Sequence, residues 1–354
     1  MKVQNVHLRH FKKFWRPPLF DFTNPETGLA QDIIILLGMN GSGKTSLLQA
    51  IAATVGVATN RLHNLSELEW PGYNYELIGD NWGQFEPEIS VQIQFSTSEL
   101  QTIQDLHKKL KELGRNYPIS PAGNHSVNLK WFNERVQADS DSEFFQLKGR
   151  EYAKQLLRFE GFKIFEKVGS ILWYTEQRTS TSLTPEDKDL RLEITEDILR
   201  DRLSKWRQFH QDVQAGRIRE LRPGQKDLYA EIEKAYRIVF PEHEFSGPVP
   251  RNKVDDILKE PWFYLYDGKN QYEISEMSGG ERAIFPMLVD FASWNIHNSI
   301  ILIDEIELHL HPPMQQALLR ALPKLGNNNQ FIITTHSDHI EQLVPDAHII
   351  RLEV

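Results

Sequence analysis

The glycine-rich stretch GMNGSGKT, residues Gly38–Thr45, constrains the fold more than any other part of this 354-residue chain. It fits the pattern G-x-x-x-x-G-K-[ST] and lies between an apolar run, Ile33–Leu37, and a helix-like sequence, Ser46–Val55. An apolar strand that leads through such a turn into a helix is typical of a parallel sheet covered on both faces. We therefore expect an α/β fold with this loop at the carboxyl edge of a parallel sheet.

The composition of the loop predicts binding of a nucleotide through its phosphates. Glycines let the backbone wrap around phosphate groups, and the N–H groups exposed by the turn form an anion cradle. In such loops the lysine, here Lys44, reaches the β- and γ-phosphates, and the threonine hydroxyl, here of Thr45, binds Mg²⁺. The other residues expected to contact ATP are Asn40, Gly41, Ser42, Gly43 and Ser46.

Two further apolar runs end in residues suited to the same chemistry. SIILIDE ends at Asp304 and Glu305, and FIITTHSD passes from a strand into His336. At the carboxyl edge of the sheet we expect Asp304 to bind Mg²⁺, directly or through water, and Glu305 to activate the attacking water as general base. His336 is expected to contact the γ-phosphate, although a histidine at this place also fits an ordinary polar strand end.

The stretch MSGGERAIFPMLVDF, residues Met277–Phe291, predicts a second anion site. Ser278, Gly279 and Gly280 stand at the start of an apolar, helical stretch. Unpaired N–H groups and the helix dipole favour negative charge at such a start. Since the chain already has a phosphate cradle, the question is which anion this second site binds.

Together these motifs resemble the ABC-type ATPases, in which the serine-glycine-glycine turn is the signature motif. The resemblance covers roughly residues 1–95 and 262–354. It implies a P-loop ATPase head of the ABC type, with a parallel sheet core and a flanking antiparallel sheet. It also implies that the signature of one subunit contacts the ATP held by another. We therefore expect a homodimer, or a higher even-numbered oligomer, that closes around ATP and Mg²⁺.

Two stretches indicate a branch of this family. VHLRHFKKF resembles the first strand of the SMC, RecF and OLD-type ATPases, in which a basic residue follows an aromatic one, here Phe11 and Lys12. DEIELHLHP is similar to the acidic-then-His-Pro stretch of the OLD-like AAA15 and AAA21 groups. Its His309 and His311 fit either a metal pair or a loop beside the dimer interface, and we prefer the loop. No Toprim nuclease domain of the OLD type is expected.

A glutamine that contacts Mg²⁺ and the attacking water in this family is harder to place. Gln177 follows the apolar run Val168–Tyr174, so we assign it to this role in metal and nucleotide binding. Gln94 is the alternative, but it belongs to the alternating strand Ile89–Phe95 and would face solvent.

The change from strand-like to helix-like patterns along the chain predicts three segments. These are an N-terminal lobe of the ATPase head at residues 1–98, a mainly helical insertion at 99–261 and a C-terminal lobe at 262–354. Within the insertion, one strand near 168–174 is expected to return to the head. Ser96 and Glu99 predict a capping box for the first inserted helix. The insertion lacks long heptads, which excludes a coiled-coil arm of the SMC type.

The composition bears on nucleic-acid binding and on the cellular location. A net charge of −9 argues against general affinity for nucleic acid, yet the Arg200–Lys226 segment is rich in arginine and lysine. That segment fits either a solvated helix face or a docking surface for nucleic acid or an acidic partner. The apolar runs are too short to cross a membrane, and no cysteine occurs, so we expect a cytoplasmic protein.

The resemblance implies an ATP-binding and ATP-hydrolysing switch that dimerises around ATP. Stand-alone heads of this branch imply a separately encoded effector protein, often a nuclease, in bacterial antiphage defence. The main alternative is a DNA repair or recombination ATPase of the RecF type that acts on DNA directly. A transporter's nucleotide subunit is disfavoured by the long stretch between Lys44 and Ser278. A binding module with structural ATP is disfavoured by the intact Glu305.

Overall fold

A parallel sheet forms the centre of the molecule. The computed structural model describes residues 1–15, 19–78, 85–176, 196–222, 224–251 and 261–353. Within these residues the sheet has the strand order β13-β3-β12-β11-β7. The bounds of these strands are Ile349–Arg351 for β13, Ile33–Leu37 for β3, Gln330–Thr335 for β12, Ile300–Ile303 for β11 and Ile171–Tyr174 for β7. All neighbouring pairs are parallel, as the sequence predicted.

The strands of this sheet are apolar throughout because both faces are covered. Along β11, Ile300 and Leu302 belong to one hydrophobic cluster, whereas Ile301 and Ile303 belong to another. All four side chains are fully buried. Such a strand cannot alternate polar and apolar residues, which explains the continuous apolar runs in the sequence.

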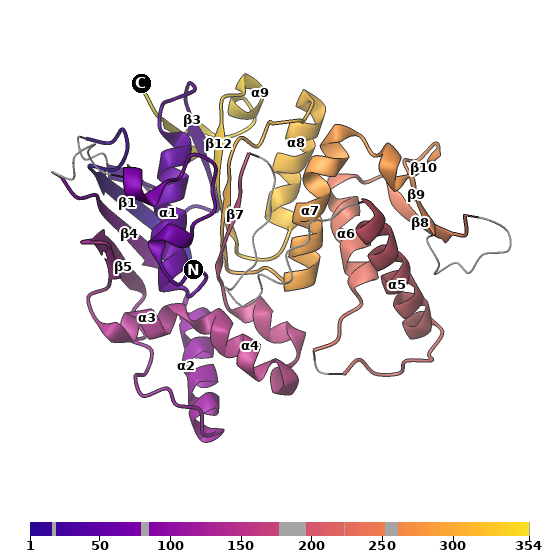
Figure 1. Ribbon diagram of the computed structural model, residues 1–354, viewed down its shortest axis with the longest axis horizontal. Helices are drawn as coiled ribbons and strands as arrows, with labels where there is room; N and C mark the ends of the chain where they lie inside the picture. Colours follow the sequence, from indigo (N-terminus) through magenta and orange to yellow (C-terminus); the bar gives the residue numbers. More distant parts are fainter. Residues whose placement is uncertain (16–18, 79–84, 177–195, 223, 252–260, 354) are drawn as a thin grey trace.

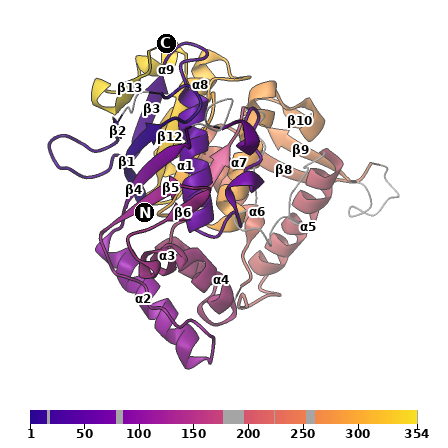
Figure 2. The ribbon, with the colours of Figure 1, turned by 60° about the vertical axis from the view of Figure 1, so that its left-hand side comes forward.

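An antiparallel sheet lies on one side of the core. Its order is β2-β1-β4-β5-β6, with bounds Leu19–Asp21, Lys2–Arg9, Glu88–Gln94, Ser126–Phe132 and Arg135–Gln137. Helix α1 (Lys44–Ala58) contacts β4 and β5 of this sheet and β7 and β12 of the parallel sheet (Figure 2). Strand β1 ends at Arg9, before the predicted end at Phe14, because His10 and Lys12 have left-handed backbone angles with φ near +50°.

The predicted insertion is built from helices and strands that also complete neighbouring sheets. Its helices are α2 (Thr97–Glu112), α3 (Asp141–Leu147), α4 (Gly149–Glu160), α5 (Glu196–Gln214) and α6 (Leu228–Val239). The sequence did not indicate β5, which pairs with β4, or β8 (Glu244–Val249), which pairs with β9. Each of these pairings crosses one of the segment limits expected at residues 98 and 261.

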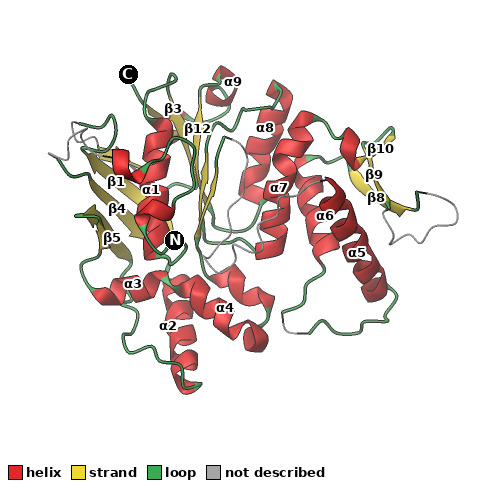
Figure 3. Ribbon diagram, in the orientation of Figure 1, coloured by secondary structure: helices red, strands yellow, loops and turns green. Residues whose placement is uncertain are grey.

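The C-terminal part supplies the helices on the other face of the parallel sheet. Helices α7, α8 and α9 span Gly279–Trp294, Pro312–Ala321 and Asp338–Glu341, and α6 packs against α7 (Figure 1). A hairpin is formed by β9 (Trp262–Tyr266) and β10 (Gln271–Glu273). Together with β8 it forms a small sheet at the end of the molecule beyond α5 and α6 (Figure 3).

Short 3-10 turns connect several of these elements, at Leu65–Glu67, Tyr75–Leu77, Phe162–Lys167, Ile274–Glu276, Leu322–Lys324 and Asp346–His348. Among the described helices, none is both long and apolar enough to cross a membrane.

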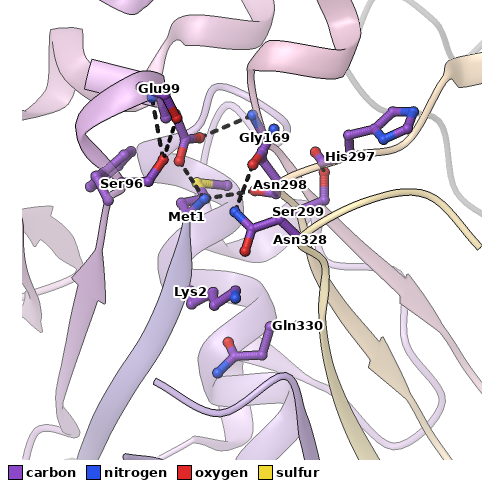
Figure 4. A network of polar contacts seen from close by, with 12 residues as sticks. Met1, Lys2, Ser96, Glu99, Gly169, His297, Asn298, Ser299, Asn328 and Gln330 are labelled. Carbon is purple, nitrogen blue, oxygen red and sulfur yellow. Dashed lines mark hydrogen bonds and ion pairs between the residues drawn. The ribbon is translucent and has the colours of Figure 1, made fainter. Parts of the chain in front are cut away.

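The start of α2 corrects one prediction. Ser96 caps the helix, since its hydroxyl accepts the Glu99 N–H at 3.3 Å. The Glu99 side chain does not complete the predicted capping box. It accepts instead from the Met1 amino group at 2.6 Å and from the Gly169 N–H at 3.1 Å (Figure 4). A buried carboxylate gains more from a charged ammonium donor than from a neutral N–H, so Glu99 joins β1 to the segment before β7.

Candidate active site

The phosphate loop connects β3 to α1 at the carboxyl edge of the parallel sheet. Gly43 precedes the helix with φ +97°, and a Cβ there would lie 2.7 Å from the ring of Phe14. A Cβ on Gly38 would lie 2.5 Å from the carbonyl oxygen of Leu352. Both contacts are closer than side chains allow, so glycine is required at these positions. Asn40 and Gly41 are exposed, whereas Ser42 is buried with a hydroxyl that has no hydrogen-bond partner in the described structure.

Two lysines approach this loop. The ammonium group of Lys44 donates to the carbonyl oxygens of Gly38 at 2.6 Å and Met39 at 3.0 Å. Burial lowers the pKa of Lys44, and the carboxylates of Glu305, Glu307 and Asp304 oppose this effect.

The second lysine is Lys13, whose ammonium group donates to the Gly41 carbonyl oxygen at 2.6 Å. Lys12, the basic residue of the family resemblance, donates to Gln49 and to the Gly72 carbonyl oxygen at 2.7 Å. The only sequence signal for Lys13 was its position beside Lys12.

Asp304 follows β11 and lies against the phosphate loop. Its Oδ1 accepts from the Thr45 hydroxyl at 3.0 Å and from the Thr334 hydroxyl at 2.6 Å. Its Oδ2 accepts from Trp70 Nε1 at 3.4 Å, and the carboxylate is almost completely buried. The structure thus brings together Thr45 and Asp304, which the sequence predicted as metal contacts. No motif had indicated Thr334 or Trp70.

These residues fit Mg²⁺. A hydroxyl and a carboxylate are hard oxygen donors, and Mg²⁺ in nucleotide sites takes only one or two such protein ligands beside phosphates and water. The third predicted metal contact, Gln177, lies outside the described residues. Its alternative, Gln94, is on β4, where its side-chain oxygen accepts the Ala30 N–H at 3.1 Å in the antiparallel sheet.

Glu305 stands next to Asp304 in a constrained backbone conformation. Its φ is +47°, and its N–H donates to the Thr334 hydroxyl at 2.7 Å. Burial raises the pKa of Glu305, and the carboxylates of Asp304, Glu307 and Glu176 raise it further. A carboxyl with a raised pKa is a stronger base when ionised, which suits the role predicted for Glu305. Glu176 is also the residue directly before Gln177.

His336 follows β12 and is held by an acid that the sequence analysis did not single out. Its Nδ1 and its backbone N–H both lie 2.7 Å from Oε1 of Glu307. Glu307 is buried, and its Oε2 has no hydrogen-bond partner in the described structure. A carboxylate at Nδ1 makes that nitrogen the donor and leaves Nε2 for another group. Glu307 lies within DEIELHLHP, so its position beside Asp304 and Glu305 was the available signal.

Within the described residues, no three histidine, cysteine or acidic side chains gather as a metal site.

The signature turn forms the start of α7. Ser278 is the N-cap residue: its hydroxyl accepts the Glu281 N–H at 3.2 Å, and its N–H donates to Glu281 Oε2 at 2.9 Å. Ser278 and Gly279 are exposed, and a Cβ on Gly279 would meet nothing within 4 Å. A Cβ on Gly280 would contact Leu310 and Met314 at 3.4 Å. In the described structure, Ser278 bonds to its own helix and not to the phosphate loop.

Much of the basic Arg200–Lys226 segment is engaged within the chain. The Arg200 guanidinium donates to both carboxylate oxygens of Glu273, at 2.6 and 2.9 Å. Burial would raise the pKa of Glu273, but the hydrogen bonds from Arg200 and Ser275 outweigh it and lower that pKa to about 2. Other basic residues with partners are Lys205 with Asp201, Arg207 over the Tyr229 ring, Arg217 with Asp212, and Lys226 with the Ala292 carbonyl. These contacts favour the interpretation as a helix face.

Comparison with known proteins shows the family of the chain. The chain matches the family model AAA_15, an AAA ATPase domain, over residues 1–340. It is 24% identical to the Retron Ec83 probable ATPase of Escherichia coli, with 99% of this chain and 71% of that protein covered. It is 23% identical to the Retron Vc95 probable ATPase of Vibrio cholerae, with 99% and 73% covered.

Solved structures that resemble the chain include two SMC heads. One is the SMC head domain from Thermotoga maritima, 15% identical over 97% of this chain and 92% of that one, with a TM-score of 0.47. The other is an SMC head bound to the C-winged helix domain of ScpA, 16% identical over 99% and 94%, with a TM-score of 0.48.

The family match spans the phosphate loop, the signature turn, the Asp304–Glu305 pair and His336. The chain therefore belongs to the AAA_15 family of AAA ATPase domains and is an ATPase.

Proposed function

We propose that this ATPase works as a switch in which two subunits close around ATP. Lys44 of each subunit holds the phosphates, and Ser278 of the opposite subunit completes the site. The observation that carries this proposal is the exposed signature turn. Ser278 and Gly279 are exposed at the start of α7, and in the described structure Ser278 bonds to Glu281 and not to its own phosphate loop. An anion brought by a second copy would satisfy the N–H groups at this helix start.

The residues of the site divide the chemistry of hydrolysis among them. Asn40 to Ser46 cradle the phosphates, and Thr45 and Asp304 hold Mg²⁺, which supplies charge neutralisation when bound. Glu305 accepts a proton from the attacking water, and its raised pKa supports this role. His336, whose ring is oriented by Glu307 at Nδ1, contacts the γ-phosphate through Nε2. Gln177 is assigned to the metal and the water by resemblance alone.

We further propose that closing and opening of the dimer controls a separate effector, of which a nuclease is the leading candidate, in bacterial antiphage defence. Two relatives that cover nearly all of this chain are named as probable ATPases of retrons, and neither name points to transport or repair. Direct action on DNA remains the second candidate. It is less favoured because Arg200, Lys205, Arg207 and Lys226 have partners inside the chain.

Light scattering of Glu305→Gln protein tests the switch. This variant keeps the shape of the site and loses the base, so ATP should convert monomers into stable dimers, whereas ADP should not. The matched control is Glu305→Gln combined with Ser278→Arg, which should stay monomeric with ATP while still binding it. Equal dimerisation of both proteins would show that the signature does not serve the closed state.

A further inference from the structure

A buried acid stands directly behind the signature turn. Glu281 is about 5% exposed. Its Oε2 accepts the Ser278 N–H at 2.9 Å, and its own N–H donates to the Ser278 hydroxyl at 3.2 Å. These two reciprocal bonds determine how the serine and the first N–H groups of α7 are presented. The position of the Glu281 carboxylate therefore sets the position of the turn.

Two tyrosines from other elements hold that carboxylate. The Tyr236 hydroxyl, on α6, donates to Glu281 Oε1 at 2.6 Å, and the Tyr272 hydroxyl, on β10, donates to the same oxygen. Burial raises the pKa of both phenols, so they remain neutral donors. Burial would also raise the pKa of Glu281, but the bonds from the two tyrosines and from Ser278 lower it, so the carboxylate stays charged.

His243 completes the network. Its Nδ1 lies 3.2 Å from the Tyr236 hydroxyl, 3.3 Å from the Tyr272 hydroxyl and 3.4 Å from Glu281 Oε1. Each phenol gives its single proton to Glu281, so each phenol oxygen can only accept from the histidine. A proton on Nδ1 satisfies all these groups together. His243, Tyr272 and Glu281 line a cleft of about 660 Å³ that also reaches Ser278, so the network is not sealed within the core.

We propose that Tyr236 and Tyr272 are positioning residues that hold the signature turn in the geometry required by the nucleotide of the second subunit. The inference rests on the proposed closure around ATP and adds the residues that prepare the signature for it. It also assigns a role to the predicted insertion, because Tyr236 lies on α6 within that segment. A shift of α6 or of the β9–β10 hairpin would reach Ser278 through two hydroxyl groups.

Tyr236→Phe and Tyr272→Phe, singly and together, test this inference, with Tyr229→Phe as matched control. Tyr229 is on the same helix as Tyr236 and, like Tyr236, is fully buried, but in the described structure its hydroxyl does not bond to Glu281. Each network variant should bind ATP within about twofold of wild type but lose about tenfold in kcat, the scale of one hydrogen bond to a charged group. Tyr229→Phe should keep its kcat, and melting temperatures verify folding.

Mixing the variants with Lys44→Ala subunits distinguishes an effect on the signature turn from general damage to the mutated subunit. Because the signature acts on the opposite nucleotide, Tyr272→Phe subunits should regain ATPase when mixed with Lys44→Ala subunits, as Ser278→Arg subunits should. If Ser278→Arg is rescued while the tyrosine variants already hydrolyse ATP at the wild-type rate, the positioning role is refuted and the switch stands. Rescue of Ser278→Arg but not of an impaired Tyr272→Phe also refutes it. If Ser278→Arg itself is not rescued, the proposed function fails first.

Discussion

Thr334→Val should destabilise the protein strongly, although valine has nearly the shape of threonine. The reason lies in the polar contacts of Thr334, whose side chain is fully buried. The hydroxyl of Thr334 makes two contacts at once. It donates to Asp304 Oδ1 at 2.6 Å and accepts the N–H of Glu305 at 2.7 Å. Valine removes both contacts and offers no replacement, while water has little access to Asp304.

The expected loss follows from these two contacts. A hydrogen bond to a charged acceptor contributes about 1.5–3 kcal/mol, and an ordinary hydrogen bond such as the one from the partly buried Glu305 N–H contributes about 0.5–1.5 kcal/mol. Asp304 keeps the bonds from Thr45 and Trp70, which limits the damage. We therefore expect the free energy of unfolding to fall by about 3 kcal/mol, a large part of the roughly 5–15 kcal/mol typical of native proteins.

Thr54→Val is the matched control. Thr54 is also fully buried, but its hydroxyl has no hydrogen-bond partner in the described structure. Removing an unsatisfied buried hydroxyl should leave stability unchanged or raise it by about 1 kcal/mol. Urea unfolding of both variants without nucleotide measures the difference through the midpoint and slope. Equal midpoints for Thr334→Val and Thr54→Val would refute the reasoning about Asp304 and Glu305.

Three other predictions concern the loop, the base and the buried ion pair. Lys44→Ala should weaken ATP binding at least about tenfold, or ~1.4 kcal/mol, by calorimetry, and unchanged affinity would remove the loop assignment. Glu305→Gln should bind ATP but hydrolyse it about 10²–10⁴-fold more slowly, and a wild-type rate would assign the base elsewhere. Glu273→Gln should lose about 3 kcal/mol at neutral pH, because the Arg200 charge stays buried. Since the folded pKa of Glu273 lies near 2, below the ordinary 4.5, this difference should shrink between those values as pH falls, and a constant difference would contradict it.

The sequence predicted the part of the fold that depends on local pattern. Apolar runs that are followed by residues suited to nucleotide binding predicted β3, β11 and β12. They also predicted that Lys44, Asp304 and His336 lie at one edge of the sheet. The capping signal of Ser96 and Glu99 predicted the start of α2, although the Glu99 side chain accepts a hydrogen bond from the distant Met1 amino group. The strand that returns near residues 168–174 was recognised because it is wholly apolar.

The contacts between distant segments could not be read from the sequence. Trp70 and Thr334 reach Asp304 only through the folded chain, and no motif marks either residue. Strand β5 was missed because its alternation, Val127, Leu129 and Trp131, was not recognised beside the helical patterns around it.

The pairing of one subunit's Lys44 with the other's Ser278 is the central claim, and two covalently linked dimers test it directly. The first joins a Lys44→Ala half to a Ser278→Arg half and retains one composite site free of both changes. The second joins a wild-type half to a half that carries both changes, so each composite site is damaged while one half is intact by itself. The account predicts ATPase activity in the first linked dimer and none in the second. Activity in the second and none in the first would contradict it.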